Sequence, residues 1–167
     1  MLYKTFYESP LGTILLVADD NNLFGLWFLN QKHYMKNINE RLVKNDELEI
    51  FKKVKRYLDN YFKGKNKSVI DVNLKPIGTH FQKIVWKELI KIPYGKTWTY
   101  TDVLNNVNKK MRRKTSVRVV ASAISRNPIS ILIPCHRVIG KDGDLKGYAG
   151  GIERKASLIK LEHTSNI

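Results

Sequence analysis

The only cysteine of the chain, Cys135, is followed directly by His136 in the stretch ISILIPCHRVIG. A thiolate is a strong nucleophile, and a neighbouring imidazole can take the thiol proton, so this pair could perform nucleophilic chemistry. Adjacent residues of an extended strand point to opposite faces, so a direct hydrogen bond between the two requires a bend or an intervening water. Pro134 and the glycine-rich segment that follows favour a bend. Glu162, in the final amphipathic segment, could orient the imidazole as a third member of the group.

A simpler interpretation of the pair is structural. A free cysteine is among the most frequently buried residues and often serves as a small hydrophobe. The apolar run ISILI, residues 129–133, predicts a buried strand that ends just before the thiol. His136 would then be an incidental neighbour, and this stretch taken alone favours that interpretation.

The composition is that of a folded protein without membrane spans. Of the 167 residues 43% are apolar, and Trp, Tyr and Phe are all present, which is enough to build a core. No apolar run is long enough to cross a membrane, and the N-terminal MLYKTFYESPLG lacks the apolar core of a signal peptide. The four histidines do not show the spacing of metal ligands, so no metal site is expected. We expect a cytoplasmic protein with no membrane partner and a reduced thiol.

The net charge is strongly positive and unevenly distributed. The chain has 30 Lys and Arg against 15 Asp and Glu, a formal +15. The part before Pro76 has 13 basic and 9 acidic residues, whereas the part from Pro76 onward, which contains Cys135, has 17 and 6. This excess predicts a polyanionic partner, and nucleic acid is favoured over a membrane because no basic helix has a large apolar face. A surface that is basic only for solubility is the alternative.

The first part of the chain, residues 1–75, predicts a small α/β domain. Strands separated by turn residues are expected at 3–8, 13–18 and 23–29. Short turns between successive strands are typical of an antiparallel sheet. A helix with one apolar face is expected over 47–62. The polar stretch 63–69 is predicted to begin a linker.

The second part, residues 76–167, predicts a mainly helical domain. Thr79 with Gln82, and Thr99 with Asp102, have the spacing of capping boxes. An apolar face of helical period follows each of them. Two helices are therefore expected to begin at these two threonines.

A third helix is expected between Ser116 and the Asn127-Pro128 stop. Its period predicts an inward face of Val117, Val120, Ala121 and Ile124, and an outward face of Arg118, Ser122 and Ser125. The turn before it, NKKMRRK, has five cations in seven residues. The helix from Thr99, this turn and the third helix together predict a DNA-binding helix-turn-helix. Simple packing of two core helices is the alternative.

Four blocks of the second part together resemble one protein family. In chain order they are GTHFQKIVW, IPYGKTWTY, RNPISILIPCHRVIG and GYAGGIERK, within residues 78–162. They are similar to the O6-alkylguanine-DNA alkyltransferases, also called methylated-DNA–protein-cysteine methyltransferases, and IPCHRVIG is the most specific match. SPLGTILLV resembles the N-terminal domain of the same family. The resemblance implies a ribonuclease-H-like α/β domain, residues 1–75, before a helical DNA-binding and alkyl-acceptor domain, residues 76–167.

The resemblance also implies roles for individual residues. Cys135 would accept the alkyl group, His136 would act as its base through a water, and Glu162 would orient His136. Asn127 matches the asparagine that ties the recognition helix to the active-site loop. Arg118 matches the arginine that enters the duplex and takes the space of the extruded nucleotide.

The same matches imply a pocket for the flipped base. Tyr100 matches the tyrosine that helps to rotate the nucleotide and gives a proton to the leaving guanine. Val138, Tyr148 and Ala149 fall where the family builds the pocket wall. Ala149 stands where some members have serine, and Ala121 replaces a common glycine.

The implied activity is a single, irreversible DNA repair reaction. The alkyl group of O6-alkylguanine lies within the stacked duplex, so the base must be flipped out to meet a buried thiol. Transfer to Cys135 leaves a stable thioether, so each molecule acts once and needs no cofactor. The expected partner is double-stranded DNA with an alkylated guanine, bound by a monomer, and O4-alkylthymine is a candidate second substrate.

One spacing departs from the family. Tyr100 and Arg118 are 18 positions apart, more than is usual, and the surplus lies in NNVNKKMRRKTSV. The additional cations in this stretch are expected to add phosphate contacts.

Two functions of other classes are alternatives to DNA repair. Alkyltransferase-like proteins bind alkylated bases without repairing them, but they lack the acceptor cysteine that is present here as Cys135. A cysteine hydrolase could use Cys135, His136 and Glu162 as a triad and turn over on a peptide or an ester. A hydrolase would leave the basic helix-turn-helix unexplained.

Overall fold

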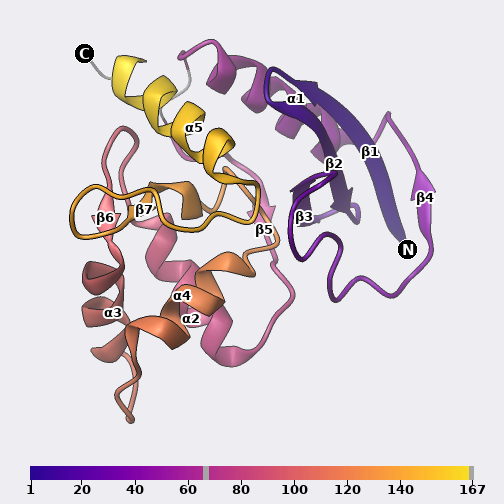
Figure 1. Ribbon diagram of the computed structural model, residues 1–167. Helices are drawn as coiled ribbons and strands as arrows, with labels where there is room; N and C mark the ends of the chain where they lie inside the picture. Colours follow the sequence, from indigo (N-terminus) through magenta and orange to yellow (C-terminus); the bar gives the residue numbers. More distant parts are fainter. Residues whose placement is uncertain (66–67, 166–167) are drawn as a thin grey trace.

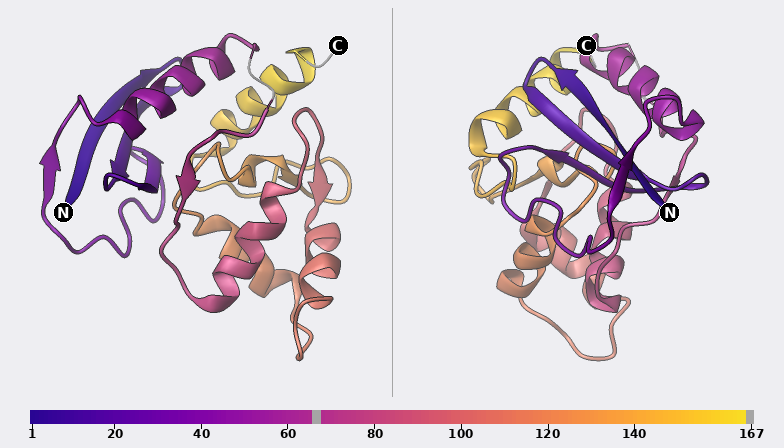
Figure 2. Two further views of the ribbon diagram at one scale, coloured as in Figure 1. Left: turned by 180° about the vertical axis from the view of Figure 1, so that it is seen from behind. Right: turned by 90° about the vertical axis from the view of Figure 1, so that its right-hand side faces the viewer.

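The computed structural model describes residues 1–65 and 68–165, which form a sheet with one helix and then a group of helices (Figure 1). The first part contains β1 (Leu2–Ser9), β2 (Gly12–Ala18), β3 (Asn22–Phe28), β4 (Leu42–Lys44), α1 (Glu49–Phe62) and β5 (Asn73–Leu74). The second part contains α2 (His80–Ile90), β6 (Trp98–Thr99), α3 (Tyr100–Asn108), α4 (Val117–Ser125), the 3-10 helix η1 (Cys135–Arg137), β7 (Val138–Ile139) and α5 (Ile152–Ser165). Figure 2 shows that α5 lies beside α1, between the sheet side of the molecule and the remaining helices.

The sheet has the strand order β4-β1-β2-β3-β5. The three long strands β1, β2 and β3 pair antiparallel, as the sequence predicted. The expectation of a purely antiparallel sheet is wrong at both edges, because β4 pairs parallel with β1 and β5 pairs parallel with β3. These edge strands have only three and two residues, too few to show a period-2 pattern in the sequence.

Both faces of the sheet are covered, which explains the almost continuous apolar sequence of β2 and β3. The inner face packs against α1 and the helical part through Ile14, Leu16, Leu26 and Phe28. The outer face packs against the chain that leads to β4 through Leu15, Val17, Phe24 and Trp27. The apolar face of α1 contributes Phe51, Val54, Leu58 and Tyr61, all buried.

The first helices of the second part begin where the sequence predicted. Thr79 and Gln82 form both hydrogen bonds of a capping box at the start of α2, and Thr99 and Asp102 do the same at α3. The indole Nε1 of Trp86 donates a hydrogen bond of 2.9 Å to a backbone carbonyl of α4. This bond joins α2 to the helix pair α3–α4, which is the predicted helix-turn-helix.

One residue of α4 lies differently from its prediction. Ser116 caps the helix, and Val120 and Ile124 are buried as expected. Val117, which was expected to face inward, is 39% exposed. It shares a helix face with Ala121 and Ile124, but at the first turn of α4 this face borders a surface cavity instead of a packed neighbour.

The segment before Cys135 is not the buried strand that its apolar sequence predicted. Ile129, Ile131 and Ile133 are buried, but only Ile129 makes a β-bridge, with Leu26 of β3. Ile131 has a φ of 69°, which a regular strand does not permit. The prolines that flank the segment have no N–H to donate to a ladder. The segment is therefore buried for packing, without extended hydrogen bonding.

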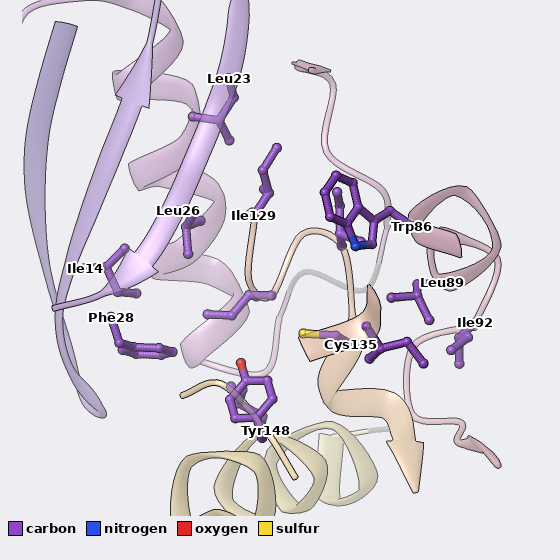
Figure 3. Close-up of a cluster of buried hydrophobic side chains, with 14 of the residues drawn as sticks. Ile14, Leu23, Leu26, Phe28, Trp86, Leu89, Ile92, Ile129, Cys135 and Tyr148 are labelled. Atoms are coloured by element: carbon purple, nitrogen blue, oxygen red, sulfur yellow. The ribbon is translucent and has the colours of Figure 1, made fainter. Parts of the chain in front are cut away.

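A single core connects the two parts of the chain. Leu26 and Phe28 of β3 belong to the same apolar cluster as Leu89, Cys135 and Tyr148 (Figure 3). The predicted linker, residues 63–69, begins directly after α1. Its residues 66–67 lie outside the described part of the chain. None of the described helices is long and apolar enough to cross a membrane.

Candidate active site

Cys135 is the first residue of η1, at the boundary between the core and a surface cavity. The residue is only 5% exposed. Figure 3 shows its sulfur directed away from Leu89 and Ile92, toward the side of the core from which Tyr148 rises. The thiol lines a cavity of about 380 Å³ whose walls come from the start of α3, from α4 and from the loop between β7 and α5.

His136 is fully buried and faces α5. Its Nε2 lies 2.6 Å from Oε2 of Glu162, which is also buried. Among the described residues no hydrogen bond joins the imidazole to the sulfur of Cys135. The chain turns at η1, so the two neighbouring side chains point in different directions. The thiol of Cys135 faces the cavity, and the imidazole of His136 faces Glu162.

The carboxylate of Glu162 collects hydrogen bonds from several parts of the chain. The hydroxyl of Tyr61, on α1, donates to Oε2 at 2.6 Å. Arg137 donates from Nε to Oε1 at 2.7 Å and from Nη2 to Oε2 at 3.2 Å. The backbone N–H of Gly95 donates to Oε1 at 3.3 Å. Five donor groups, including His136, therefore surround one buried carboxylate.

These contacts determine the protonation of the pair. Burial would raise the pKa of Glu162, but hydrogen bonds and charge from His136 and Arg137 outweigh it and lower this pKa to about 2. Burial lowers the pKa of His136, against the opposing effect of Glu162. At neutral pH the carboxylate is ionised and can only accept, so Nε2 of a neutral imidazole must carry the proton. Nδ1, which has no partner in the described protein, then has its lone pair available.

The thiol of Cys135 is protonated in the resting protein. Burial raises its pKa to about 11, although a hydrogen bond from Asn127 and the charge of Lys155 act in the opposite direction. A thiol with this pKa is a poor nucleophile at neutral pH. Its reaction therefore requires a base that takes the proton.

Asn127 connects the end of α4 to the segment that leads to the thiol. Its Nδ2 donates to the carbonyl of Ile133 at 2.7 Å, and its Oδ1 accepts the N–H of Ile129 at 3.0 Å. Asn127 is 3% exposed. The side chain thus replaces the strand pairing that this segment lacks.

The cavity wall includes three of the residues that the resemblance assigned to the base pocket. Tyr100, Tyr148 and Ala149 line it. The hydroxyl of Tyr100 donates to the carbonyl of Lys146 at 2.8 Å, and burial and the nearby Cys135 raise its pKa. Val138 is not at the wall: its side chain is fully buried in β7, which pairs with β6.

Arg118 lies outside the cavity, on the first turn of α4. It is exposed and has no hydrogen-bond or ion-pair partner within residues 1–65 and 68–165. Its neighbour Val117 lines the cavity. An arginine in this position is free to reach beyond the protein surface at the cavity rim.

Sequence reasoning missed three residues of the site. Lys155 is buried and donates from Nζ to the carbonyls of Lys146 at 2.9 Å and Gly147 at 3.2 Å. Burial lowers its pKa to about 8. Tyr61 and Arg137 hold Glu162. A signal for Lys155 was present in the sequence, because it falls on the same helical face as Glu162, seven residues before it.

The acid stability of the protein should depend on Glu162. Since its pKa is about 2 in the folded state and 4.5 ordinarily, its contribution is complete above pH 4.5 and is lost as the pH falls toward 2. We expect Glu162→Gln to be less stable than the wild type above pH 4.5. The difference between their free energies of unfolding should shrink by about 3 kcal/mol as the pH falls from 4.5 toward 2. Urea unfolding at a series of pH values measures this. Glu153→Gln, an exposed change on α5, should parallel the wild type, and a parallel curve for Glu162→Gln would contradict the prediction.

Comparison with known proteins finds relatives that match nearly the whole chain. Residues 2–76 match the ribonuclease-like domain of 6-O-methylguanine DNA methyltransferase, and residues 80–164 match its DNA-binding domain. A methylated-DNA–protein-cysteine methyltransferase of Methanosarcina acetivorans is 44% identical over 161 residues, 96% of this chain and 98% of the relative. The one from Haemophilus influenzae is 38% identical, over 96% and 86%.

Solved structures give the same result. Mycobacterium tuberculosis OGT, crystallised in complex with DNA, superposes with a TM-score of 0.87 at 34% identity, over 98% of this chain and 94% of that one. The O6-methylguanine-DNA methyltransferase of Pyrococcus kodakaraensis superposes with a TM-score of 0.62 at 26% identity, over 97% and 99%. Sequence and fold agree, and the chain belongs to the O6-methylguanine DNA methyltransferase family.

Proposed function

We propose that this protein repairs O6-alkylguanine in double-stranded DNA by transferring the alkyl group to Cys135. The observation that supports this best is the single thiol, which lines a cavity of ligand size and has the buried pair His136–Glu162 behind it. Relatives named methylated-DNA–protein-cysteine methyltransferases, and the DNA complex of one structural relative, support methylated DNA as substrate and partner.

The substrate base must leave the duplex to react. Cys135 is 5% exposed, so a base that remains stacked cannot reach the sulfur, and the modified guanine is flipped into the cavity. Flipping costs a few kcal/mol, and less for a weakly paired, damaged base. Arg118, exposed at the rim of the cavity, enters the space that the nucleotide leaves and holds the gap open.

Activation of the thiol uses the free nitrogen of His136. Nδ1 takes the thiol proton through a bridging water, and the ionised Glu162 stabilises the imidazolium that forms. The charge of Lys155 lowers the pKa of Cys135, so it also favours the thiolate. Three residues of the site, His136, Glu162 and Lys155, thus act on one proton, which is necessary because the pKa of the resting thiol is about 11.

Transfer is a substitution at the alkyl carbon. The sulfur attacks this carbon from the side opposite O6, the S–C bond forms, and the C–O6 bond breaks with its electron pair going to guanine. Guanine takes up one proton, for which the hydroxyl of Tyr100 at the cavity wall is the donor, and the proton taken from the thiol restores the balance. The products are a thioether at Cys135 and unmodified guanine. The thioether is not readily hydrolysed, so each molecule acts once and needs no cofactor.

The cavity wall sets which alkyl groups fit. Tyr148 and Ala149 contact the flipped base through their side chains, whereas Val138, whose side chain is in the core, can offer only its backbone. The small Ala149 leaves room beside the base. Alkyl groups larger than methyl, and the O4-alkyl group of thymine, are therefore candidate substrates.

The proposed partner surface is that of a monomer. Every group of the proposed mechanism comes from one chain, and the helix pair α3–α4 lies at the cavity. The excess of cations in the second part of the chain favours the DNA backbone. A thiol that must stay reduced to act is suited to the cytoplasm.

The first test is intact-protein mass spectrometry after mixing with a duplex that contains one O6-methylguanine. We expect one methyl group per molecule, located at Cys135 by peptide mapping, and no change for Cys135→Ala. Binding without a change of mass would indicate a damage-recognition protein with an inert thiol. Neither binding nor transfer, with turnover on an ester, would indicate a cysteine hydrolase.

The role of His136 as base predicts a pH dependence. For His136→Gln we expect methyl transfer to be slower by a factor of about 10² to 10⁴ at neutral pH. The rates of the variant and the wild type should converge as the pH rises toward about 11, because the thiol of Cys135 then ionises without a base. Single-turnover rates at several pH values measure this. His80→Gln, which changes an exposed histidine at the start of α2, is the control, and a deficit that is constant with pH would exclude the base role.

Lys155 is predicted to position the cavity loop. Lys155→Met removes the two hydrogen bonds to the loop carbonyls and the charge beside the thiol. We expect transfer to slow by about 100-fold, because small displacements of reacting groups are costly. Lys160→Met, an exposed change on the same helix, should react at the wild-type rate. Equal rates for both variants would show that the loop needs no support from Lys155.

A further inference from the structure

The turn between α3 and α4 forms a projection that the proposed mechanism does not use. We call residues 109–114 the cationic arm. Figure 1 shows it as the lowest part of the molecule, and both views of Figure 2 agree that it extends away from the body, at the end opposite α1. Five of its six residues are Lys or Arg. Its length and charge are more than a connection between two helices requires.

The arm is held in place at its base. The N–H of Thr115 donates to Oδ1 of Asn108 at 2.8 Å, which closes the loop across its two ends. Nζ of Lys114 donates to the backbone carbonyl of Asn108 at 3.0 Å. Met111 is half-buried and packs against the core. With Met111 turned inward, the charged neighbours on either side of it are turned outward.

The outward charges are not neutralised within the protein. The five cations are all exposed, and they are Lys109, Lys110, Arg112, Arg113 and Lys114. In the part of the chain that the structure describes, none of them forms an ion pair with a carboxylate. The acidic residue of the adjoining helix, Asp102, is engaged in the capping box of α3. Five adjacent cations repel one another, so this arrangement favours an external polyanion.

The arm ends just before the rim of the active-site cavity. Its last residue, Lys114, is three positions before Val117, which lines the cavity, and four before the exposed Arg118. A duplex that delivers a base to Cys135 must therefore pass close to the arm. Within residues 109–114 the one apolar side chain, Met111, packs against the core, so the arm itself lacks the apolar centre that a protein interface needs.

We infer that the cationic arm binds the phosphate backbone of the DNA that flanks the modified base. This inference rests on the proposed function, which brings the duplex to the cavity. α4 has nine residues, a length of about 14 Å at 1.5 Å per residue, which spans only a few base pairs. The arm adds phosphate contacts beyond this span. It contributes affinity without sequence preference, which suits the repair of damage in any sequence.

The test compares two variants that each remove two cations. Arg112→Ser with Arg113→Ser changes the arm. Lys53→Ser with Arg56→Ser removes two exposed cations from α1, at the other end of the molecule. The dissociation constant for an undamaged duplex is measured at several salt concentrations. Each lost phosphate contact should make the slope of log K against log salt concentration shallower by about 0.9. With two cations removed, the slope of the arm variant should be shallower than that of the wild type by up to about 1.8.

The control variant should keep the wild-type slope. An unchanged slope for the arm variant overturns the inference, and an equal loss for both variants overturns it too, because only total charge would then matter. Methyl transfer from free O6-methylguanine base, followed by mass spectrometry, is measured in parallel. The arm variant should retain this reaction at the wild-type rate, which shows that its site is intact. Absence of transfer from a duplex that contains O6-methylguanine in the wild type would instead refute the proposed function, whatever the slopes are.

If the arm variant also loses transfer from the free base, its site is damaged. The slope is then measured on Arg112→Gln with Arg113→Gln, which keeps long polar side chains but removes both charges. A shallower slope in that variant supports the inference, and the wild-type slope overturns it.

Discussion

The buried carboxylate of Glu162 is the interaction on which the rest of the site depends. An ionised group in the interior is costly unless it is paired and hydrogen-bonded. Tyr61 comes from α1, Gly95 from the turn before β6, and His136 and Arg137 from η1. Satisfying one charge therefore joins the sheet part of the molecule to the helical part, and it fixes the position of the residues next to the thiol.

Helix α5 shapes both sides of the thiol. Lys155 and Glu162 are seven residues apart, about two turns, and they lie on the same buried face. Lys155 holds the cavity loop through the carbonyls of Lys146 and Gly147, while Glu162 holds His136 on the opposite side. Helix α5 thus sets the distance between the loop at the cavity wall and the imidazole of His136, which takes the thiol proton.

The resting state of Cys135 suits a reagent that can be used only once. Burial keeps the thiol protonated, and oxidation as well as alkylation proceeds through an accessible thiolate. A thiol that is buried and neutral is protected from oxidation and from unspecific alkylation until the flipped guanine occupies the cavity. Asn127 holds the segment before the thiol in place through its hydrogen bonds to the backbone of Ile129 and Ile133.

Local signals in the sequence determined where most elements begin, and tertiary contacts decided the rest. Thr79 and Thr99 start helices through hydrogen bonds to residues three positions on, so their role is visible in a short stretch. The apolar runs of β2 and β3, each bounded by turn residues, are visible in the same way. The sequence also identified Cys135 and its family motif. The run 129–133 does not form the strand that its apolar sequence predicts, because a buried strand and a buried irregular segment have the same apolar sequence. The hydrogen bonds that distinguish them come from residues outside the run, such as Asn127. The bond between Tyr61 and Glu162 spans 101 positions, and only the folded chain brings these two side chains together.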